Sequence, residues 1–360
     1  MIFHYFKIAF RNLCKHKTQN IISIIGLAVG LLCFCVCIYC SRFVESTDHC
    51  FANHDRIAEL NLYDGKADRY FSGSPIPLAE ELRTWALGET EAISSVTYPR
   101  ERPYYVELSP EKTLPYELET IEIDTCYNKI FTPEMVAGHW KMASQSLNSV
   151  ILSQSMAIKI FGNAESAIGK HMTLMRRLNT SPESTPKTGG IVYTIQAVMK
   201  DISLNNSLDF MQNIDMLTVN DSEGLLQSPK RHNMTGANTY ALLSPQTTCT
   251  DLEKQFSKRD YTYTLYGEAY TVTASSMGAR LKKQGASYLG LVTGIIGTLI
   301  LLVGLINFFH FLIGSFFNRT KEYSIMKMIG CNWKQLFYLL FTQSLIVISI
   351  SSILVLSGIE

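Results

Sequence analysis

The chain has 360 residues, of which 47% are hydrophobic and 18% are charged, and its formal net charge is +1. Because no region is strongly basic, the charge excludes nucleic acid as the main partner. The composition is close to that of a soluble protein, but it averages three long charge-free segments with an ordinary polar region. Each of these segments is long enough to cross a bilayer as a helix, which takes about 20 apolar residues.

Residues 1–19 form a predicted amphipathic helix ahead of the first charge-free segment. Phe3, Phe6, Phe10 and Leu13 share one helical stripe, and basic residues alternate with them. This pattern is typical of a helix that lies in the membrane interface with its basic face at the lipid headgroups. The simpler alternative is that the basic residues only fix the topology, and the two interpretations are compatible.

Residues 20–41 form the first predicted transmembrane helix. The apolar run is longer than the about 7–15 residues of a signal-peptide core, and no A-x-A cleavage pattern follows it. We therefore expect this segment to remain as a membrane anchor. Gly26 and Gly30 form a G-x-x-x-G pair within it, and this spacing lets two membrane helices approach closely.

The cysteines indicate neither a metal site nor a disulfide framework. Those in the first span follow a C-x-C-x-C-x-x-C pattern, but a helix would spread the thiols around its surface, and no histidine or carboxylate joins them. Those between the first two spans are widely spaced, which leaves one disulfide among them as an open alternative. The two groups are Cys33, Cys35, Cys37 and Cys40 in the span, and Cys50, Cys126 and Cys249 beyond it.

Residues 42–284 are predicted to form an α+β domain between the first and second spans, with an inserted lobe at about 130–240. A segment rich in Ser, Thr, Pro and Gly predicts a loop at Arg177–Gly190. Alternating apolar residues and β-branched or aromatic residues predict the strands. These strands are Leu118–Thr125, Val150–Leu152, Ile191–Met199 and Tyr261–Ala274.

Capping residues predict helices in the same domain. A proline at a helix start and a glycine just past a helix end are typical of helix boundaries, as is a serine at the N-cap. A Thr-x-x-Glu sequence is typical of a capping box. The predicted helices are Pro77–Leu87, which ends before Gly88, a helix from the cap Ser153 to Gly162, and a helix that begins with the capping box Thr250–Glu253.

The sequence carries no catalytic, cofactor-binding or metal-binding motif. Gly162–Lys170 superficially resembles a phosphate-binding loop, but six residues separate its glycines where four are needed. His171 also follows Lys170, at the position where Ser or Thr would bind magnesium. No H-x-x-x-H or G-x-S-x-G sequence occurs. The sequence therefore favours a non-enzymatic protein without a cofactor of its own.

Residues 285–317 and 335–358 form the second and third predicted transmembrane helices, and a charged segment at 318–334, the elbow, joins them. Gly290 and Gly294 repeat the G-x-x-x-G spacing of the first span. The second span also contains two polar residues, for which an interhelical hydrogen bond is the simplest role and a functional role the alternative. These are Asn307 and His310.

The distribution of basic residues predicts the orientation in the membrane. By the positive-inside rule, the N-terminus and the elbow lie in the cytoplasm, and the large domain lies outside. A basic cluster at the start of the second span argues the other way, but long domains translocate largely regardless of charge. The basic residues are Lys7, Arg11, Lys15 and Lys17 before the first span, Arg319, Lys321, Lys327 and Lys334 in the elbow, and the opposing Arg280, Lys282 and Lys283.

The elbow contains an amphipathic helical pattern. Glu322, Ile325, Met326 and Ile329 lie at helical spacing, with basic residues around them. Such a short helix at the inner membrane surface is suited to docking a cytoplasmic partner. A simple interfacial turn is the alternative.

Several segments, taken in order, resemble ABC transporter permeases of the MacB/FtsX type. Phe6–Leu13 with Lys17 resembles the amphipathic start of that family, and Asn318–Gly330 resembles its FtsX-type elbow. The ordered set spans nearly the whole chain. The segments that resemble the MacB-like periplasmic core domain are Asn148–Gly162, Ala167–Lys170, and Tyr193–Asp201 followed by Asn206 and Ser207.

The resemblance implies a non-catalytic permease subunit in a bacterial inner membrane, with ATP bound and hydrolysed by a separate cytoplasmic ABC ATPase. Motion would pass to the periplasmic domain for export or mechanotransmission, with antibiotic, peptide or lipoprotein substrates. It also implies a dimer with a second permease copy or half, and contact with a periplasmic adaptor and an outer-membrane channel. The residues implied in ATPase coupling are Arg319, Lys321, Glu322, Ile325, Met326, Lys327 and Gly330.

Two features depart from the family pattern. Gln343 stands where the family usually has an acid, which puts any role of that charge in doubt. The family unit has four spans, so the FtsX-like region at 285–360, with two of them, would be incomplete at its C-terminus. A membrane-anchored extracytoplasmic sensor without transport is the alternative function. A membrane-tethered enzyme is disfavoured because catalytic motifs are absent.

Overall fold

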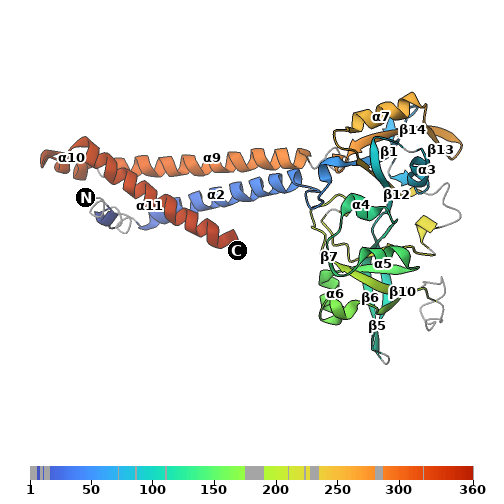
Figure 1. The fold of residues 1–360 in the computed structure, drawn as a ribbon. Coiled ribbons are helices and arrows are strands. Elements are labelled where there is room, and N and C mark those ends of the chain that lie inside the picture. The colour runs from blue at the N-terminus through green and yellow to red at the C-terminus, as the bar shows by residue number, and fades with distance from the viewer. Residues whose placement is uncertain are drawn as a thin grey trace, which may run out of the picture. The chain divides into compact units, whose positions relative to one another are not determined.

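The computed structural model describes residues 6–8, 11, 17–71, 73–85, 87–109, 112–174, 190–209, 211–222, 224–227, 235–279, 287–318 and 320–359. The chain forms two compact units (Figure 1). The helical unit consists of Met1–Glu45 and Gln284–Glu360, and the sheet unit consists of Ser46–Lys283.

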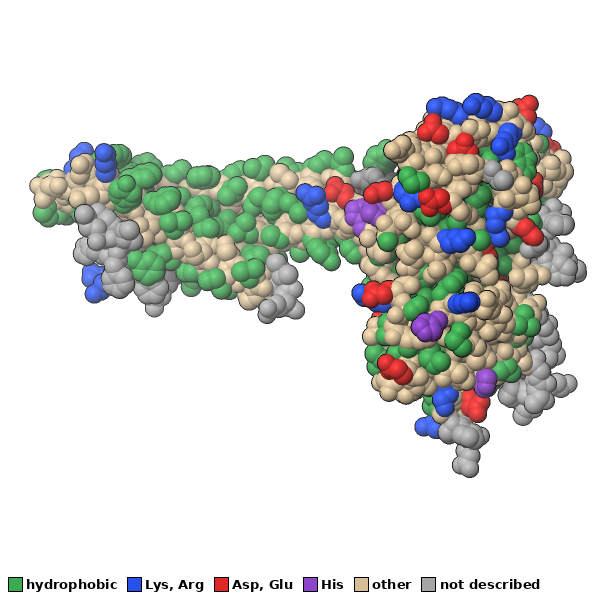
Figure 2. Space-filling view, in the orientation of Figure 1, with side chains coloured by type: hydrophobic (Ala, Val, Ile, Leu, Met, Phe, Trp, Pro, Cys, Tyr) green, Lys and Arg blue, Asp and Glu red, His purple; other side chains and the backbone are tan. Residues whose placement is uncertain are grey.

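Among the described residues of the helical unit, three helices are long and apolar enough to cross a membrane. They are α2 (Lys17–Glu45), α9 (Ser287–Asn318) and α11 (Trp333–Ile359), and a short helix, α10 (Thr320–Met328), precedes the last of them. Figure 2 shows hydrophobic side chains over most of the visible surface of these helices, as lipid-facing helices require. The predicted fold class, three long apolar helices with an α+β domain between the first and the second, is confirmed.

The three long helices share a small apolar core. Leu27 of α2, Phe308 of α9 and Val347 of α11 are buried against one another. Ser351 of α11 donates a hydrogen bond from its hydroxyl to the carbonyl oxygen of Ile24, at 3.1 Å. A hydroxyl inside a membrane bundle needs such a partner, because lipid offers none. The helices therefore pack through both apolar and polar contacts.

One half of the sheet unit is an open antiparallel sheet. Its order is β13, β14, β1, β12, β4, and helices α3 (Leu78–Thr84) and α7 (Cys249–Lys258) contribute to its apolar core. The central strand β1 pairs with β12 on one side and with β14 on the other. The strands are β13 (Thr262–Leu265), β14 (Glu268–Ser276), β1 (Ile57–Asp64), β12 (Thr235–Leu243) and β4 (Thr90–Thr97).

The other half is a closed ring of strands, in the order β11, β8, β10, β9, β5, β6 and back to β11. Most neighbours in this strand ring are antiparallel, but β6 with β11 and β8 with β10 are parallel. Closure leaves no free edge along the ring. The strands are β5 (Arg100–Ser109), β6 (Lys112–Ile123), β8 (Ser149–Ser153), β9 (His171–Leu174), β10 (Val192–Met199) and β11 (Met216–Val219).

Short elements complete the sheet unit. The centre of β8 is apolar at successive positions because both faces of the strand are buried. Val150 and Leu152 belong to one core cluster and Ile151 belongs to another, as the two-residue period of a strand requires. The short elements are β2 (Arg69–Tyr70), β3 (Ser74–Pro75), β7 (Met135–Gly138), α4 (Tyr127–Phe131), α5 (Trp140–Gln145), α6 (Gln154–Phe161), and the single 3-10 turns η1 (His54–Arg56), η2 (Glu165–Ala167) and η3 (Leu225–Gln227).

The local predictions around β8 and α6 are confirmed. The hydroxyl of Ser153 accepts the backbone N–H of Met156, and Gly162 ends α6 with a φ of 88°. The helix predicted at Pro77 is present, but it ends at Thr84, before the glycine that was expected to stop it. The loop predicted at Arg177–Gly190 lies outside the described residues apart from its last residue.

Two other local predictions are wrong. The capping box of α7 is formed by Thr248 and Asp251, two residues before the predicted one, because the Thr248 hydroxyl reaches the Asp251 backbone N–H. The segment predicted as one strand at Tyr261–Ala274 is a hairpin, β13 and β14, with its turn at Tyr266 and Gly267. Both turn residues have positive φ, which favours a tight hairpin turn.

Candidate functional site

The elbow is a defined turn built from local sequence. Helix α10 ends at Met328, and Gly330 in the following turn has a φ of 97°, a conformation that glycine adopts without strain. The backbone N–H of Cys331 then donates to the carbonyl of Met326 at 3.0 Å, which satisfies the last turn of the helix. The backbone N–H of Asn332 donates to the Gln335 side chain at 3.0 Å, and this bond closes the start of α11.

One face of α10 packs inward. Tyr323 and Met326 contact a small apolar cluster that includes Leu336 and Leu339 of α11. Ile8, in the N-terminal segment, packs against the same cluster. The elbow is therefore held by side chains from α9, α10 and α11 together with the N-terminal segment, rather than by the turn alone.

The other face of α10 presents apolar side chains outward. Ile325 and Met328 of α10 are 53% and 79% exposed, and Ile329, in the turn that follows, is 82% exposed. Lys321, Glu322 and Lys327 are exposed beside them, and the Lys327 ammonium lies 6.0 Å from the centre of the Trp333 ring. We name Ile325, Met328 and Ile329 the elbow patch. An apolar patch rimmed by charges suits contact either with another protein or with the membrane interface.

The elbow residues named in the sequence analysis divide between these two faces. Ile325 lies in the elbow patch, whereas Met326 lies in the apolar cluster behind it. Gly330 forms the turn, and Arg319 lies outside the described residues. Met328 was not singled out in the sequence. The sequence did offer one signal: Met328 lies three residues after Ile325, and this spacing places two side chains on the same face of a helix.

Small residues bring α2 and α9 together. A Cβ on Gly30 would lie 3.4 Å from the Cα of Gly304, so the two backbones touch at this point. Gly26 faces the Asn307 side chain, and a Cβ on Gly297 would lie 2.6 Å from the Cβ of Cys37. Such close approach is the use that membrane helices make of glycine.

The second predicted glycine pair is less involved in this packing. A Cβ on Gly290 would meet Ser41 at 3.6 Å, which is ordinary contact, and a Cβ on Gly294 would meet open space. Gly297 and Gly304, which the sequence analysis did not single out, make the tighter contacts. In the sequence they look like the other glycines of α9, and only the packing of α9 against α2 shows that they make close contacts.

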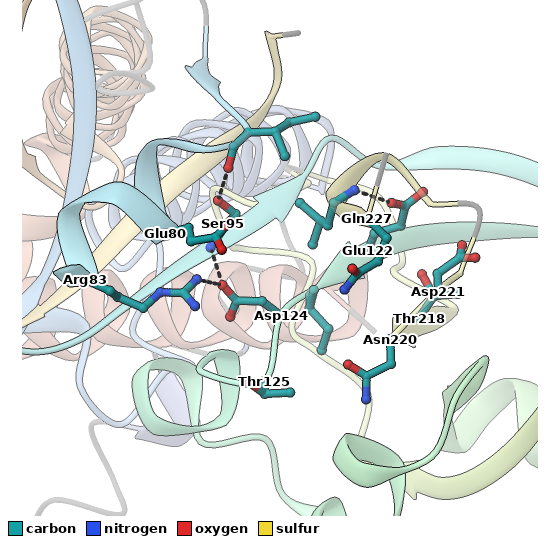
Figure 3. Close-up of a pocket in the computed structure, with 13 residues that line it drawn as sticks. Glu80, Arg83, Ser95, Glu122, Asp124, Thr125, Thr218, Asn220, Asp221 and Gln227 are labelled. Carbon is teal, nitrogen blue, oxygen red and sulfur yellow. Dashed lines mark hydrogen bonds and ion pairs between the residues drawn. The ribbon is translucent and has the colours of Figure 1, made fainter. Parts of the chain in front are cut away.

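A polar cavity of about 230 Å³ lies in the sheet unit, where the parallel strands β6 and β11 end (Figure 3). The carboxyl ends of parallel strands meet at one edge, so their following side chains converge. Figure 3 shows Asp124 after β6 and Asn220 and Asp221 after β11 around this space. The remaining lining comes from Ile76, which precedes α3, and from α3, β4 and the turn at Leu225–Gln227.

Asp124 is fully engaged at one side of the cavity. Its carboxylate forms an ion pair with Arg83 (Figure 3). It also accepts the Ser94 hydroxyl at 2.7 Å, and the backbone N–H groups of Ser95 and Cys126 at 3.0 and 2.9 Å. So many donors hold the carboxylate in one orientation, which indicates a structural role at the end of β6.

A buried ion cluster lies at the other side. Arg102 donates to Glu122 at 2.7 Å and lies 4.0 Å from Asp221, and each of these acidic side chains is 3% exposed. Burial alone would lower the pKa of Arg102, but the charges of Glu122, Tyr104 and Asp221 and the hydrogen bond to Glu122 together outweigh it, so the pKa is raised. Burial raises the pKa of Tyr104 to about 12, and burial, followed by the charge of Asp221, raises that of Tyr193.

The side chains that line the cavity determine which groups it can bind. The described lining residues contain neither histidine nor cysteine, and three of the lining acids, Asp124, Glu122 and Asp221, lie beside Arg83 or Arg102. Such a lining can hydrogen-bond water or a small polar group. Sequence reasoning missed this cavity, because its residues come from four segments that are far apart in the chain and carry no shared motif.

Comparison with known proteins identifies the C-terminal region. Residues 294–359 match the family model described as FtsX-like permease C-terminal. Among curated proteins, none matches the chain.

Three solved structures resemble the chain in fold. A domain described as that of a permease from Porphyromonas gingivalis is 20% identical, with a TM-score of 0.46, and the match covers 63% of this chain and 93% of that one. The periplasmic region of MacB from Actinobacillus actinomycetemcomitans is 14% identical (TM-score 0.41; 66% and 94% covered). The extracellular domain of YknZ, a noncanonic ABC-type transporter from Gram-positive bacteria, is 11% identical (TM-score 0.37; 61% and 99% covered).

The matched region holds most of α9 together with α10 and α11, so it includes the elbow and its patch. In residues 294–359, this chain is therefore similar to the C-terminal region of FtsX-like permeases.

Proposed function

We propose that this chain is the permease subunit of an ABC transporter and that the elbow docks a separate cytoplasmic ATPase. Hydrolysis in that ATPase moves the elbow, α9 and α11, and the motion serves export or mechanotransmission through the sheet unit. The observation that carries the proposal is the elbow patch: three exposed aliphatic side chains, within a domain of the FtsX-like permease type, on a helix whose turn and inner face are fixed.

The charge pattern supports the orientation that this proposal needs. Basic residues dominate both the N-terminal segment and the elbow, which favours a cytoplasmic location for the two. The sheet unit then lies on the outer side. A second permease copy, a periplasmic adaptor and an outer-membrane channel are further partners that the family resemblance suggests, with antibiotics, peptides or lipoproteins as substrate classes.

Co-purification tests the docking surface. The full chain is isolated from its native membranes with an affinity tag, and any ABC ATPase bound to it is identified by mass spectrometry. Replacing Ile325 or Ile329 by Asp puts a charge in the elbow patch, so we expect the bound ATPase to fall by about 10-fold or more, since buried charges at interfaces cost several kcal/mol. The charge reversal Glu322→Lys at the rim should have a smaller effect.

A matched control separates docking from general damage. Val192→Asp introduces the same acid at an exposed aliphatic residue of the sheet unit and should leave ATPase association unchanged. Met326→Asp is unsuitable as a docking test, because Met326 packs in the apolar cluster and its loss would disturb the elbow itself. An ATPase that stays bound to both the Ile325 and the Ile329 variants would show that the elbow patch is not its docking site.

A further inference from the structure

A groove of about 650 Å³ runs between α2 and α9, near the C-terminal end of α2. Both helices belong to the helical unit, so the groove lies within one compact part of the chain. It is open at Gly294, where an added Cβ would meet no atom of the described residues within 4 Å. Its walls are aliphatic, and Ile38, Ile295 and Leu299 are 42%, 54% and 57% exposed. A groove of this size and lining can hold an apolar ligand.

The groove has about the length of one membrane leaflet. On α2 its lining runs from Phe34 to Glu45, which is roughly 16 Å of helix. The hydrocarbon core of a bilayer is about 30 Å thick, so the acyl chains of one leaflet span about 15 Å. Glu45 is also the last residue of the apolar span in α2. The groove therefore extends from one membrane surface to about the middle of the bilayer, where lipid is the solvent.

Two opposite charges line the groove at its membrane-surface end. The Arg42 guanidinium and the Glu45 carboxylate lie 3.6 Å apart, and their side chains are 80% and 65% exposed. At this distance the ion pair is looser than a hydrogen bond, so the guanidinium keeps donors, and the carboxylate keeps acceptors, for a ligand. The Ser41 hydroxyl lies at the same end. The site therefore combines apolar walls with one cation beside one anion.

We propose that this groove binds a phospholipid whose headgroup carries a primary ammonium. One acyl chain lies between α2 and α9, the phosphate accepts hydrogen bonds from Arg42, and the ammonium donates to Glu45. A purely anionic headgroup would satisfy Arg42 but would place its charge beside Glu45, and a quaternary ammonium has no N–H to donate. The site depends on the membrane location of the two helices, and it requires neither an ATPase nor the sheet unit.

A second transmembrane helix fits this groove less well. A helix with its side chains is about 10–12 Å across, and interfaces between membrane helices favour small residues that let the backbones approach. The walls of the groove carry Ile38, Leu291 and Leu299 instead. Because α2 and α9 already touch through Gly30 and Gly304, the narrow space left beside their contact suits a hydrocarbon chain.

Photocrosslinking of the full chain in lipid nanodiscs tests the site. The discs contain phosphatidylethanolamine with a diazirine in one acyl chain, or the matched phosphatidylcholine or phosphatidylglycerol probe, and mass spectrometry locates the adducts. We expect adducts of the ethanolamine probe to concentrate on the groove residues of α2 and α9. Gly294→Leu fills the groove at a position with space for a side chain, and it should lower these adducts about 10-fold. Val303→Leu, at an exposed position of α9 outside the groove, should leave them unchanged.

A second variant keeps the test decisive if Gly294→Leu does not fold. Glu45→Gln removes the anion and should reduce the preference for the ethanolamine over the glycerol headgroup about threefold or more, as loss of an exposed ion pair does. Glu165→Gln, the same change at an exposed residue of the sheet unit, should leave the preference unchanged. The site is overturned if a folded Gly294→Leu protein crosslinks like the parent, or if the three probes label the groove equally. Benzoylphenylalanine in place of Ile295 identifies the occupant: an adduct with lipid supports the site, and an adduct with a second copy of the chain overturns it.

Discussion

Replacing Gly297 by Ala should disrupt the pairing of α2 and α9. The new Cβ would lie 2.6 Å from the Cβ of Cys37, 3.1 Å from its sulfur and 3.6 Å from the Cα of Phe34. Carbon atoms in contact normally lie about 3.5–4.0 Å apart, so the helices must separate by about 1 Å at this level. Overpacking of this kind costs about 1–3 kcal/mol, and we expect the free energy of unfolding to fall by that amount.

The same helix offers a matched control. Gly294 lies one turn earlier in α9, and a Cβ there would meet open space. Gly294→Ala should therefore be neutral or stabilising by up to about 1 kcal/mol, because alanine is the better helix former. Cys37→Gly removes the atom that the new methyl group would strike, so the double variant Cys37→Gly, Gly297→Ala should recover part of the loss.

Reversible unfolding of the full chain in bicelles, followed by circular dichroism, measures these differences. Equal stability of the two alanine variants would refute the packing argument, because the structure gives them very different surroundings.

Three further predictions concern the elbow and the sheet unit. Gly330→Ala should weaken the elbow by about 1–2 kcal/mol, since its φ of 97° suits only glycine, and protease sensitivity of the elbow measures this change. Arg102→Met should lower the free energy of unfolding by about 3–5 kcal/mol in a denaturant titration, because it leaves Glu122 and Asp221 buried without their cation; an unchanged midpoint would contradict the ion cluster. The pKa of Tyr104 is raised to about 12 by burial, above the usual value of about 10, so the folded state holds its proton longer than the unfolded state. Stability should therefore fall as pH rises from about 10 to 12, by up to about 3 kcal/mol, and the fall should be smaller in Tyr104→Phe.

The membrane helices were predictable because their signal is local. An uncharged apolar run of sufficient length has few other stable forms, so the sequence indicated all three long helices. The helix start at Ser153 was readable for the same reason, since the cap and the residue that it bonds are three positions apart. The misplaced capping box of α7 shows the limit of this signal: Thr248 and Thr250 both offer a hydroxyl, and only the folded chain decides between them.

Features that depend on tertiary pairing were not predictable. Met326 and Ile325 are neighbours in an amphipathic pattern, and only the packing of α11 shows which of them is buried. The polar cavity joins residues of β6 to residues that follow β11, and the hydrogen bond between Thr47 and Asn205 joins residues 158 positions apart; single sequences carry no signal for such contacts. The closure of the strand ring likewise depends on the parallel pairing of β6 with β11. No local sequence pattern indicates that these two strands are neighbours.

The sheet order also fixes a sequence of assembly during synthesis. The strands of the ring all lie between residues 100 and 219, so the ring is complete in the growing chain before the open sheet is. Strand β1 leaves the ribosome first, yet both of its long-range partners, β12 and β14, come last. Its buried apolar residues must therefore wait for about 180 residues of further chain. Until these partners arrive, the unpaired apolar strand exposes the nascent domain to aggregation, which chaperones limit.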